Sequence, residues 1–105
     1  RLAVTGEVFI PVAFRQDPPN ARIVDGQELS VFVRNNTDQD IRIRYFSVDA
    51  KLDVIKRAEV FPAHQETQFT FKKRPGVMPD SLFIQLETPV NGRDNYTYRF
   101  GNVRP

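Results

Sequence analysis

The stretch of residues 29–48 constrains the fold of this chain more than any other. It reads LSVFVRNNTDQDIRIRYFSV, two alternating runs joined by a polar segment. Alternation of apolar and polar residues with a period of two is typical of a strand with one buried face. Turn-forming residues fill the segment 35–40. The pattern predicts a β-hairpin with two inward-facing sets of side chains: Leu29, Val31 and Val33, and Ile41, Ile43 and Tyr45.

The same alternation extends to most of the chain. Apolar residues at even positions from Leu2 to Phe14 predict a long first strand, and Pro11 indicates a sheet edge because proline cannot donate to a ladder. Further strands are expected over residues 67–72, 81–88 and 95–101. Residues 52–61 fit either a strand or one face of a helix. We favour strand, because no N-cap pattern opens a helix there.

Strong turn signals separate these segments. Asp25-Gly26 precedes the central stretch, and Asn91-Gly92 is a typical two-residue hairpin turn. The length of 105 residues suits one domain, spanning residues 1–105. About seven strands at this spacing predict an all-β, antiparallel two-sheet sandwich that is immunoglobulin-like in general terms.

Composition narrows the possible functions. The absence of cysteine excludes disulfides, thiolate catalysis and cysteine zinc sites. The net charge is only +2, from 15 basic and 13 acidic residues that are interleaved, which disfavours nucleic acid as a partner. No apolar run is long enough for a transmembrane helix. Because the chain begins with Arg1 rather than Met, we expect a piece of a longer protein or a removed signal.

No arrangement of residues predicts catalysis, a metal or a cofactor. His64 is the only histidine, and we expect it to be an exposed loop residue. The loop carboxylates lack the glycine-bearing pattern of a calcium loop. None of the serines lies in a nucleophile elbow. The protein is therefore predicted not to be an enzyme.

The order of the segments resembles that of a known domain family. The features are a strand entering residues 35–40, a strand over 41–48, a small turn at 49–52, Val60-Phe61-Pro62 before a polar loop, and Arg74-Pro75-Gly76 before residues 81–88. Residues 28–88 thereby resemble a bacterial β-sandwich domain of unknown function that occurs in secreted and surface proteins and beside caspase-like peptidase domains. They also resemble immunoglobulin-like domains. The resemblance implies an accessory or interaction module without catalytic residues. Ala63 and His64 stand where that loop usually has glycine.

The opposite face of the predicted hairpin suggests a binding surface. Phe32, Phe46 and Phe83 fall opposite the apolar sets of their strands, as do Arg42 and Arg44. Exposed aromatic residues mark partner surfaces. The alternative is a strand that is buried on both sides or covered by a second sheet. The predicted partner-binding residues are Phe32, Arg42, Arg44 and Phe46.

The function predicted from these features is non-catalytic protein interaction or scaffolding. The host would be a larger bacterial envelope, periplasmic or secreted protein. The partner would be another protein or a neighbouring domain of the same chain. The alternative is a nucleic-acid-binding β-barrel that uses an arginine and aromatic sheet face, although the low net charge favours a solvated outer face instead.

Overall fold

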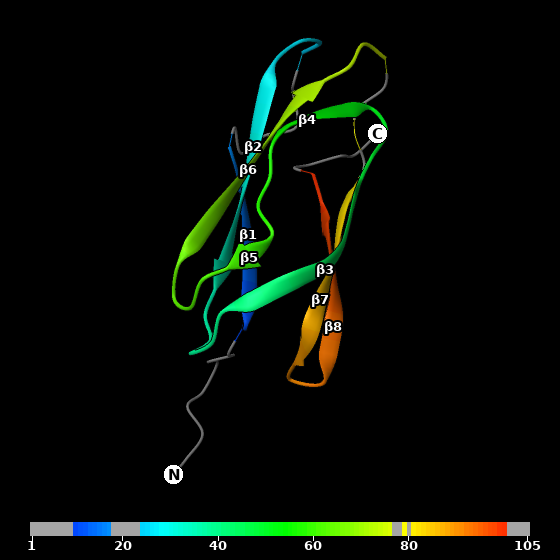
Figure 1. The fold of residues 1–105 in the computed structure, drawn as a ribbon. Coiled ribbons are helices and arrows are strands. Elements are labelled where there is room, and N and C mark those ends of the chain that lie inside the picture. Colours follow the sequence, from blue (N-terminus) through cyan, green and yellow to red (C-terminus); the bar gives the residue numbers. More distant parts are fainter. Residues whose placement is uncertain (1–9, 18–23, 77–78, 80, 101–105) are drawn as a thin grey trace, which may run out of the picture.

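The structure is a computed structural model that describes residues 10–17, 24–76, 79 and 81–100. In these residues the chain forms eight strands, as expected from the alternation of apolar and polar side chains. The strands form two antiparallel four-stranded sheets that pack face to face (Figure 1). Sheet one has the order β1-β2-β6-β4, and sheet two has the order β5-β3-β7-β8. The strands are β1 (Val12–Asp17), β2 (Glu28–Asn35), β3 (Ile41–Val48), β4 (Leu52–Lys56), β5 (Val60–Phe61), β6 (Glu66–Lys73), β7 (Ser81–Val90) and β8 (Arg93–Arg99).

The predicted two-sheet sandwich is confirmed, but it has eight strands rather than about seven. The difference lies in residues 52–61, which the structure divides between β4 in sheet one and β5 in sheet two. β5 has two residues, too few for a detectable alternation. β1 is an end strand, as Pro11 indicates. Residues 1–9 of the predicted first strand lie outside the described residues. Within the described residues, no helix is long and apolar enough to cross a membrane.

The predicted hairpin of β2 and β3 is wrong, because these strands belong to different sheets. β2 pairs with β1 and β6, whereas β3 pairs with β5 and β7. Residues 36–40 therefore form an arch that carries the chain from one sheet to the other. Turn-forming residues suit either connection, and the flanking alternation is the same in a hairpin and in an arch.

The side chain of Asn35 holds this arch from inside. It is completely buried, and its Nδ2 donates to the backbone carbonyls of Gln39 at 2.8 Å and Phe61 at 2.9 Å. Its Oδ1 accepts from the backbone N–H of Thr37 at 2.9 Å and from the Thr37 hydroxyl at 2.6 Å. The amide is thus fully satisfied, and it ties the arch to β5 without a strand ladder.

The connection between β7 and β8 is a hairpin, as Asn91-Gly92 predicts. Both residues have positive φ, 54° for Asn91 and 74° for Gly92. This backbone matches the right-handed twist of the strands that it joins, and it favours asparagine followed by glycine. It places the tip of the hairpin beside the start of β1.

Apolar side chains from both sheets meet around a row of stacked phenyl rings. Phe46 of β3 lies parallel to Phe69 of β6, with 5.3 Å between ring centroids, and Phe71 lies 6.4 Å from Phe69. Phe61 and Phe100 meet the row edge-on, each at 6.0 Å. Such stacked and edge-to-face contacts suit the ring quadrupoles. The buried apolar side chains are Val12, Leu29, Val31, Val33, Ile41, Leu52, Phe61, Phe69, Phe71, Leu82, Ile84, Leu86, Tyr96 and Phe100.

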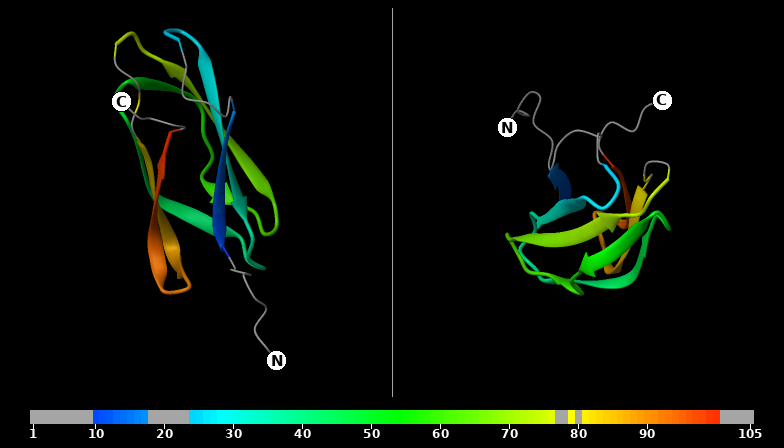
Figure 2. Two further views of the ribbon diagram at one scale, coloured as in Figure 1. Left: turned by 180° about the vertical axis from the view of Figure 1, so that it is seen from behind. Right: turned by 90° about the horizontal axis from the view of Figure 1, so that it is seen from above.

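The two lateral sides of the sandwich are closed in different ways. On one side lie β1 and β8, the end strands of the two sheets, as the view from behind in Figure 2 shows. There Phe14 stacks on Tyr98 at 5.2 Å, and the Tyr98 hydroxyl donates to Gln16 at 3.1 Å. On the other side, β4 and the short β5 are the end strands, and the segment between them crosses the opening.

Candidate functional site

An extra residue in β3 reverses the faces of the second half of the strand. Ile43 pairs with Leu86 of β7, but Tyr45 pairs with Gln85, so β3 has one additional residue at Arg44. A β-bulge of this kind moves the following side chains to the opposite face of the sheet. Tyr45 is therefore 53% exposed, where the sequence predicts a core position.

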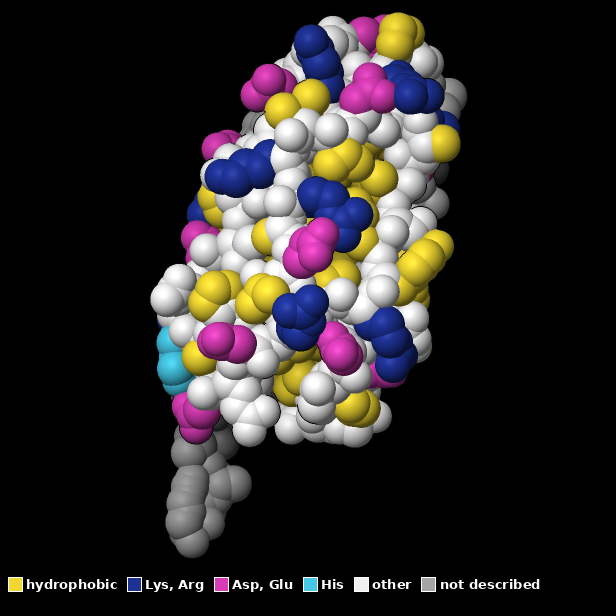
Figure 3. All heavy atoms as spheres, viewed as in Figure 1, with side chains coloured by type: hydrophobic (Ala, Val, Ile, Leu, Met, Phe, Trp, Pro, Cys, Tyr) yellow, Lys and Arg dark blue, Asp and Glu magenta, His cyan; other side chains and the backbone are white. Residues whose placement is uncertain are grey.

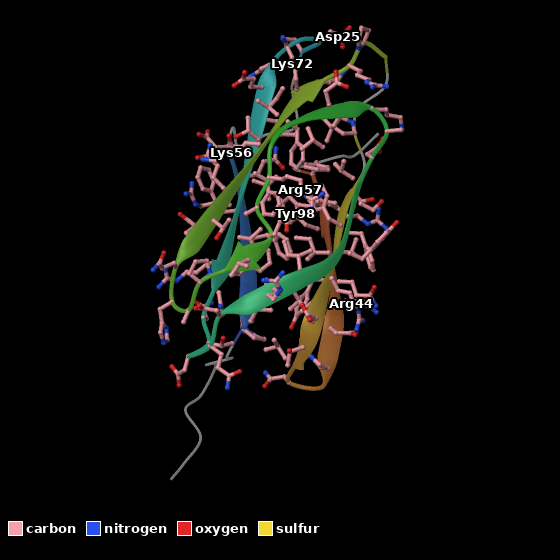
Figure 4. All side chains as sticks on the ribbon, in the orientation of Figure 1. Asp25, Arg44, Lys56, Arg57, Lys72 and Tyr98 are labelled. Atoms are coloured by element: carbon pink, nitrogen blue, oxygen red, sulfur yellow. The ribbon has the colours of Figure 1, made fainter. Side chains whose placement is uncertain are left out.

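The predicted outward orientation of Phe46 is wrong for the same reason. Its ring stacks on Phe69 at 5.3 Å and on Phe71 at 6.4 Å. Arg57, just after β4, places its guanidinium 4.4 Å from the centroid of the Phe46 ring. Figure 4 shows Arg57 at the opening between the two sheets, and Figure 3 shows apolar side chains around basic ones there. This cation–π contact covers the core where the sheets diverge.

Phe32 points outward, as the sequence predicts, but from sheet one. Arg15 of β1 lies over its ring, 4.1 Å from the centroid. Glu66 of β6 accepts a hydrogen bond of 3.1 Å from Arg15, and this bond raises the pKa of Arg15 above its ordinary value. The guanidinium is thus fixed over Phe32, and the ring is largely covered.

Arg42 and Arg44 are exposed on β3 of sheet two, and Figure 4 shows Arg44 directed away from sheet one. Arg42 lies 3.2 Å from Glu87, and Arg44 lies 2.7 Å from Asp94. Pairs this exposed add little to stability. They do compensate the two positive charges, so this part of sheet two is not strongly basic.

The four predicted binding residues therefore do not form one surface. Only Arg42 and Arg44 lie together. Phe32 belongs to the outer face of the opposite sheet, and Phe46 belongs to the core. The prediction is wrong because the arch places Phe32 on the opposite sheet from the two arginines, and the bulge turns Phe46 into the core.

An aromatic pair that the sequence reasoning missed lies on the same sheet as these arginines. Tyr45 and Phe83 meet with 5.9 Å between ring centroids and 59° between ring planes. The outward position of Phe83 follows from its alternation, but that of Tyr45 requires the bulge. The strand register places uncharged polar side chains around the pair, and we call the whole set the Tyr45–Phe83 face: Tyr45, Phe83, Ser47, Gln85, Asn95 and Thr97.

His64 is exposed, as predicted, and lies in the turn that precedes β6, where it contacts the arch. Its Nε2 is 2.7 Å from Asp38, and its backbone has a φ of 58°. This left-handed conformation favours glycine, the residue usual in this loop of the resembling domains. In the described part of the chain, no three His, Asp or Glu side chains come together to hold a metal ion.

Lys73 is the most deeply buried charge in the described ranges. Its side chain is 2% exposed, and Nζ donates to Asp25 at 2.5 Å and to the carbonyls of Arg74 and Gly76 at 3.1 Å each. These partners satisfy all three donors of the ammonium group. Lys73 therefore fastens two loops at one end of the sandwich.

No family model matches the chain, and no curated protein or solved structure matches it significantly.

Proposed function

We propose that the protein is a non-catalytic interaction domain that docks another protein, or a neighbouring domain of its own chain, on the Tyr45–Phe83 face. The observation that carries the proposal is the exposure of Tyr45, 53%, beside a second aromatic ring on a regular sheet. Tyrosine offers a large, stiff apolar surface with a polar tip, and it is enriched at the centres of protein interfaces.

The surroundings of the pair fit an uncharged partner surface. Phe83 pairs with Ser47 of β3 on one side and with Thr97 of β8 on the other. Tyr45 pairs with Gln85 of β7, which in turn pairs with Asn95 of β8. Hydroxyl and amide groups adapt to donors and acceptors of a partner without the desolvation cost of a charge. We expect the ion pairs of Arg42 and Arg44 to lie toward the rim of such an interface.

The proposal extends to the class and location of the domain. The order β1-β2-β6-β4 in sheet one, and β3-β7-β8 in sheet two beside the additional β5, is similar to the A-B-E-D and C-F-G sheets of immunoglobulin constant domains. This order supports an immunoglobulin-like module, and the sequence resemblance supports a place in a larger bacterial envelope, periplasmic or secreted protein. The nucleic-acid alternative has less support, because Arg42 and Arg44 each contact a carboxylate.

Site-specific photo-crosslinking tests the proposed face. A benzoyl-phenylalanine replaces Tyr45 in one variant of the full-length protein, and Gln68, on the outer face of sheet one, in a matched control. We expect a discrete protein adduct, or an intramolecular one, from position 45 and none from position 68. Adding Phe83→Ala should weaken binding of the crosslinked partner by about 30-fold, the effect of losing an interface hot spot. Equal adducts from both positions, or none from position 45, would refute the proposal.

A further inference from the structure

A hollow lies on the lateral side that β1 and β8 share, apart from the Tyr45–Phe83 face. Its volume is about 320 Å³, and its apolar walls include Ile10, Pro11, Val12 and Val90. The wall before β1 is held in place by Asn36. The side chain of Asn36 donates to the carbonyl of Ile10 at 2.8 Å, and its backbone N–H donates to the carbonyl of Pro11 at 2.8 Å.

Two polar side chains of β8 line the same hollow. Tyr96 is 7% exposed, and its buried hydroxyl has no hydrogen-bond partner among the described residues. Because the hydroxyl is closed off from solvent, Tyr96 lines the hollow with its ring and not with its polar tip. The guanidinium of Arg93 lies 4.8 Å from the centroid of the Tyr96 ring, with its Nε donating to the carbonyl of Asn95 at 2.8 Å.

The charge of Arg93 is not compensated within the described part of the chain. Arg15, Arg42, Arg44 and Arg74 each lie within ion-pair distance of a carboxylate, whereas no described carboxylate is that close to Arg93. Arg34 and Arg57 resemble Arg93 in this respect, but neither of them lines the hollow. A guanidinium that is fixed beside an apolar hollow suits a carboxylate attached to an apolar group.

The backbone beside the hollow is also suited to a ligand. β8 is the end strand of sheet two, and no described strand pairs with its outer edge. Such an edge accepts an extended peptide as an additional strand, with main-chain hydrogen bonds giving affinity and pockets giving specificity.

We propose that this hollow binds the apolar C-terminal residue of an extended peptide that pairs with the outer edge of β8. The apolar side chain enters between Val12 and Val90. The terminal carboxylate contacts Arg93, and the apolar side chain packs against the Tyr96 ring. This site is independent of the proposed function, because no residue of the Tyr45–Phe83 face lines the hollow.

The test is a titration of the whole protein with a short N-acetylated peptide ending in Thr-Leu, followed by NMR. We expect saturable shifts of the Val12 and Val90 methyl resonances. The same peptide with an amidated C-terminus should bind at least about tenfold more weakly, because a charge-assisted hydrogen bond is lost. Arg93→Gln should cause the same loss, whereas Tyr96→Phe, which removes only the enclosed hydroxyl and keeps the ring, should bind normally. Arg74→Gln, an arginine outside the hollow, is the matched control and should bind normally.

Three results would overturn the proposal. The absence of saturable shifts would show that the hollow is not a peptide site. Equal affinity for the acid and the amide would remove the role of Arg93. Equal affinity for 4-methylpentanoate, which has the leucine-like side chain and carboxylate but no peptide backbone, would exclude pairing with β8.

Discussion

The aromatic side chains on the outer faces of the two sheets have different surroundings. On sheet one, Phe32 lies beneath Arg15, and Gln68 beside it donates to the hydroxyls of Ser30 and Thr70. On sheet two, Tyr45 stands against Phe83, and no described cation lies over either ring. On the first face the aromatic ring is covered, whereas on the second face the Tyr45 ring is exposed.

This difference shows that an outward aromatic residue is a weak indicator of binding until its cover is known. The alkyl stem of arginine can shield an aromatic ring while its head stays in water. Phe32 and Phe83 are indistinguishable in their strand patterns, yet only Phe32 has such a cover. The predictions below separate the roles of these rings and of the core that both sheets share.

The largest effect is expected for Phe69→Ala in the shared core. Phe69 is fully buried and contacts Phe46, Phe61 and Phe71. Its truncation should lower the free energy of unfolding by about 3–5 kcal/mol, measured by urea denaturation. Phe83→Ala and Phe32→Ala, on the two outer faces, should each cost only about 1 kcal/mol. A loss for Phe83→Ala as large as that for Phe69→Ala would place Phe83 in the core.

Phe46→Ala and deletion of Arg44 together test the register of β3 on β7. The loss of the Phe46 ring from the stack should cost about 3 kcal/mol, measured by urea denaturation. Deletion of Arg44 should cost less than about 1 kcal/mol, because Tyr45 then follows Ile43 in regular alternation and keeps its pairing with Gln85, while Phe46 stays inward. Arg44→Ala keeps the residue count and removes only the exposed pair with Asp94, so it should cost as little. A deletion as costly as Phe46→Ala would contradict this register.

Asn35→Ala tests the arch that joins the two sheets. It removes the donor of the buried Phe61 carbonyl and the acceptor of two groups of Thr37. We expect a loss of about 2 kcal/mol in the free energy of unfolding, since buried polar groups lose their partners. Asn95→Ala, an exposed position, is the control and should have little effect. If both variants behave alike in thermal unfolding, the arch does not depend on the Asn35 amide.

The smallest effect is expected for Tyr96→Phe. Its hydroxyl has no partner among the described residues, so its removal should leave stability near neutral pH unchanged or slightly higher. Burial raises the pKa of Tyr96, although the charge of Arg93 lowers it in part. The unfolded chain therefore ionises first, and wild-type stability should fall as the pH rises above about 10. Unfolding midpoints measured across this range should fall less steeply in the variant, and parallel curves would contradict the assignment.

The sequence is sufficient to place most strands, because one buried face imposes a period of two. Leu82, Ile84 and Leu86, for example, are all buried as their alternation predicts. The proposed binding surface could not be predicted in the same way. In the second half of β3, Tyr45 falls on one face of the strand and Phe46 and Val48 fall on the other. Large apolar or aromatic side chains therefore occur on both faces, and the pattern does not show which face is buried. Only the ladder with β7 shows where the additional residue lies.

The arch that follows Asn35 could not be predicted from the sequence for a different reason. The residues that build an arch are the same turn formers that build a hairpin. What distinguishes the arch is the burial of one amide against β5, a strand that is distant in sequence and only two residues long. No local pattern contains that contact.

The arch also has a kinetic consequence. Because β2 and β3 do not pair with each other, β2 must find β6 and β3 must find β7 across long loops of chain, which slows folding. The hairpin at Asn91-Gly92 joins strands that are adjacent in sequence, and hairpins of this kind form in about 1–10 μs. We therefore expect the β7–β8 hairpin to form first and the whole sandwich to follow on a timescale of roughly milliseconds to seconds.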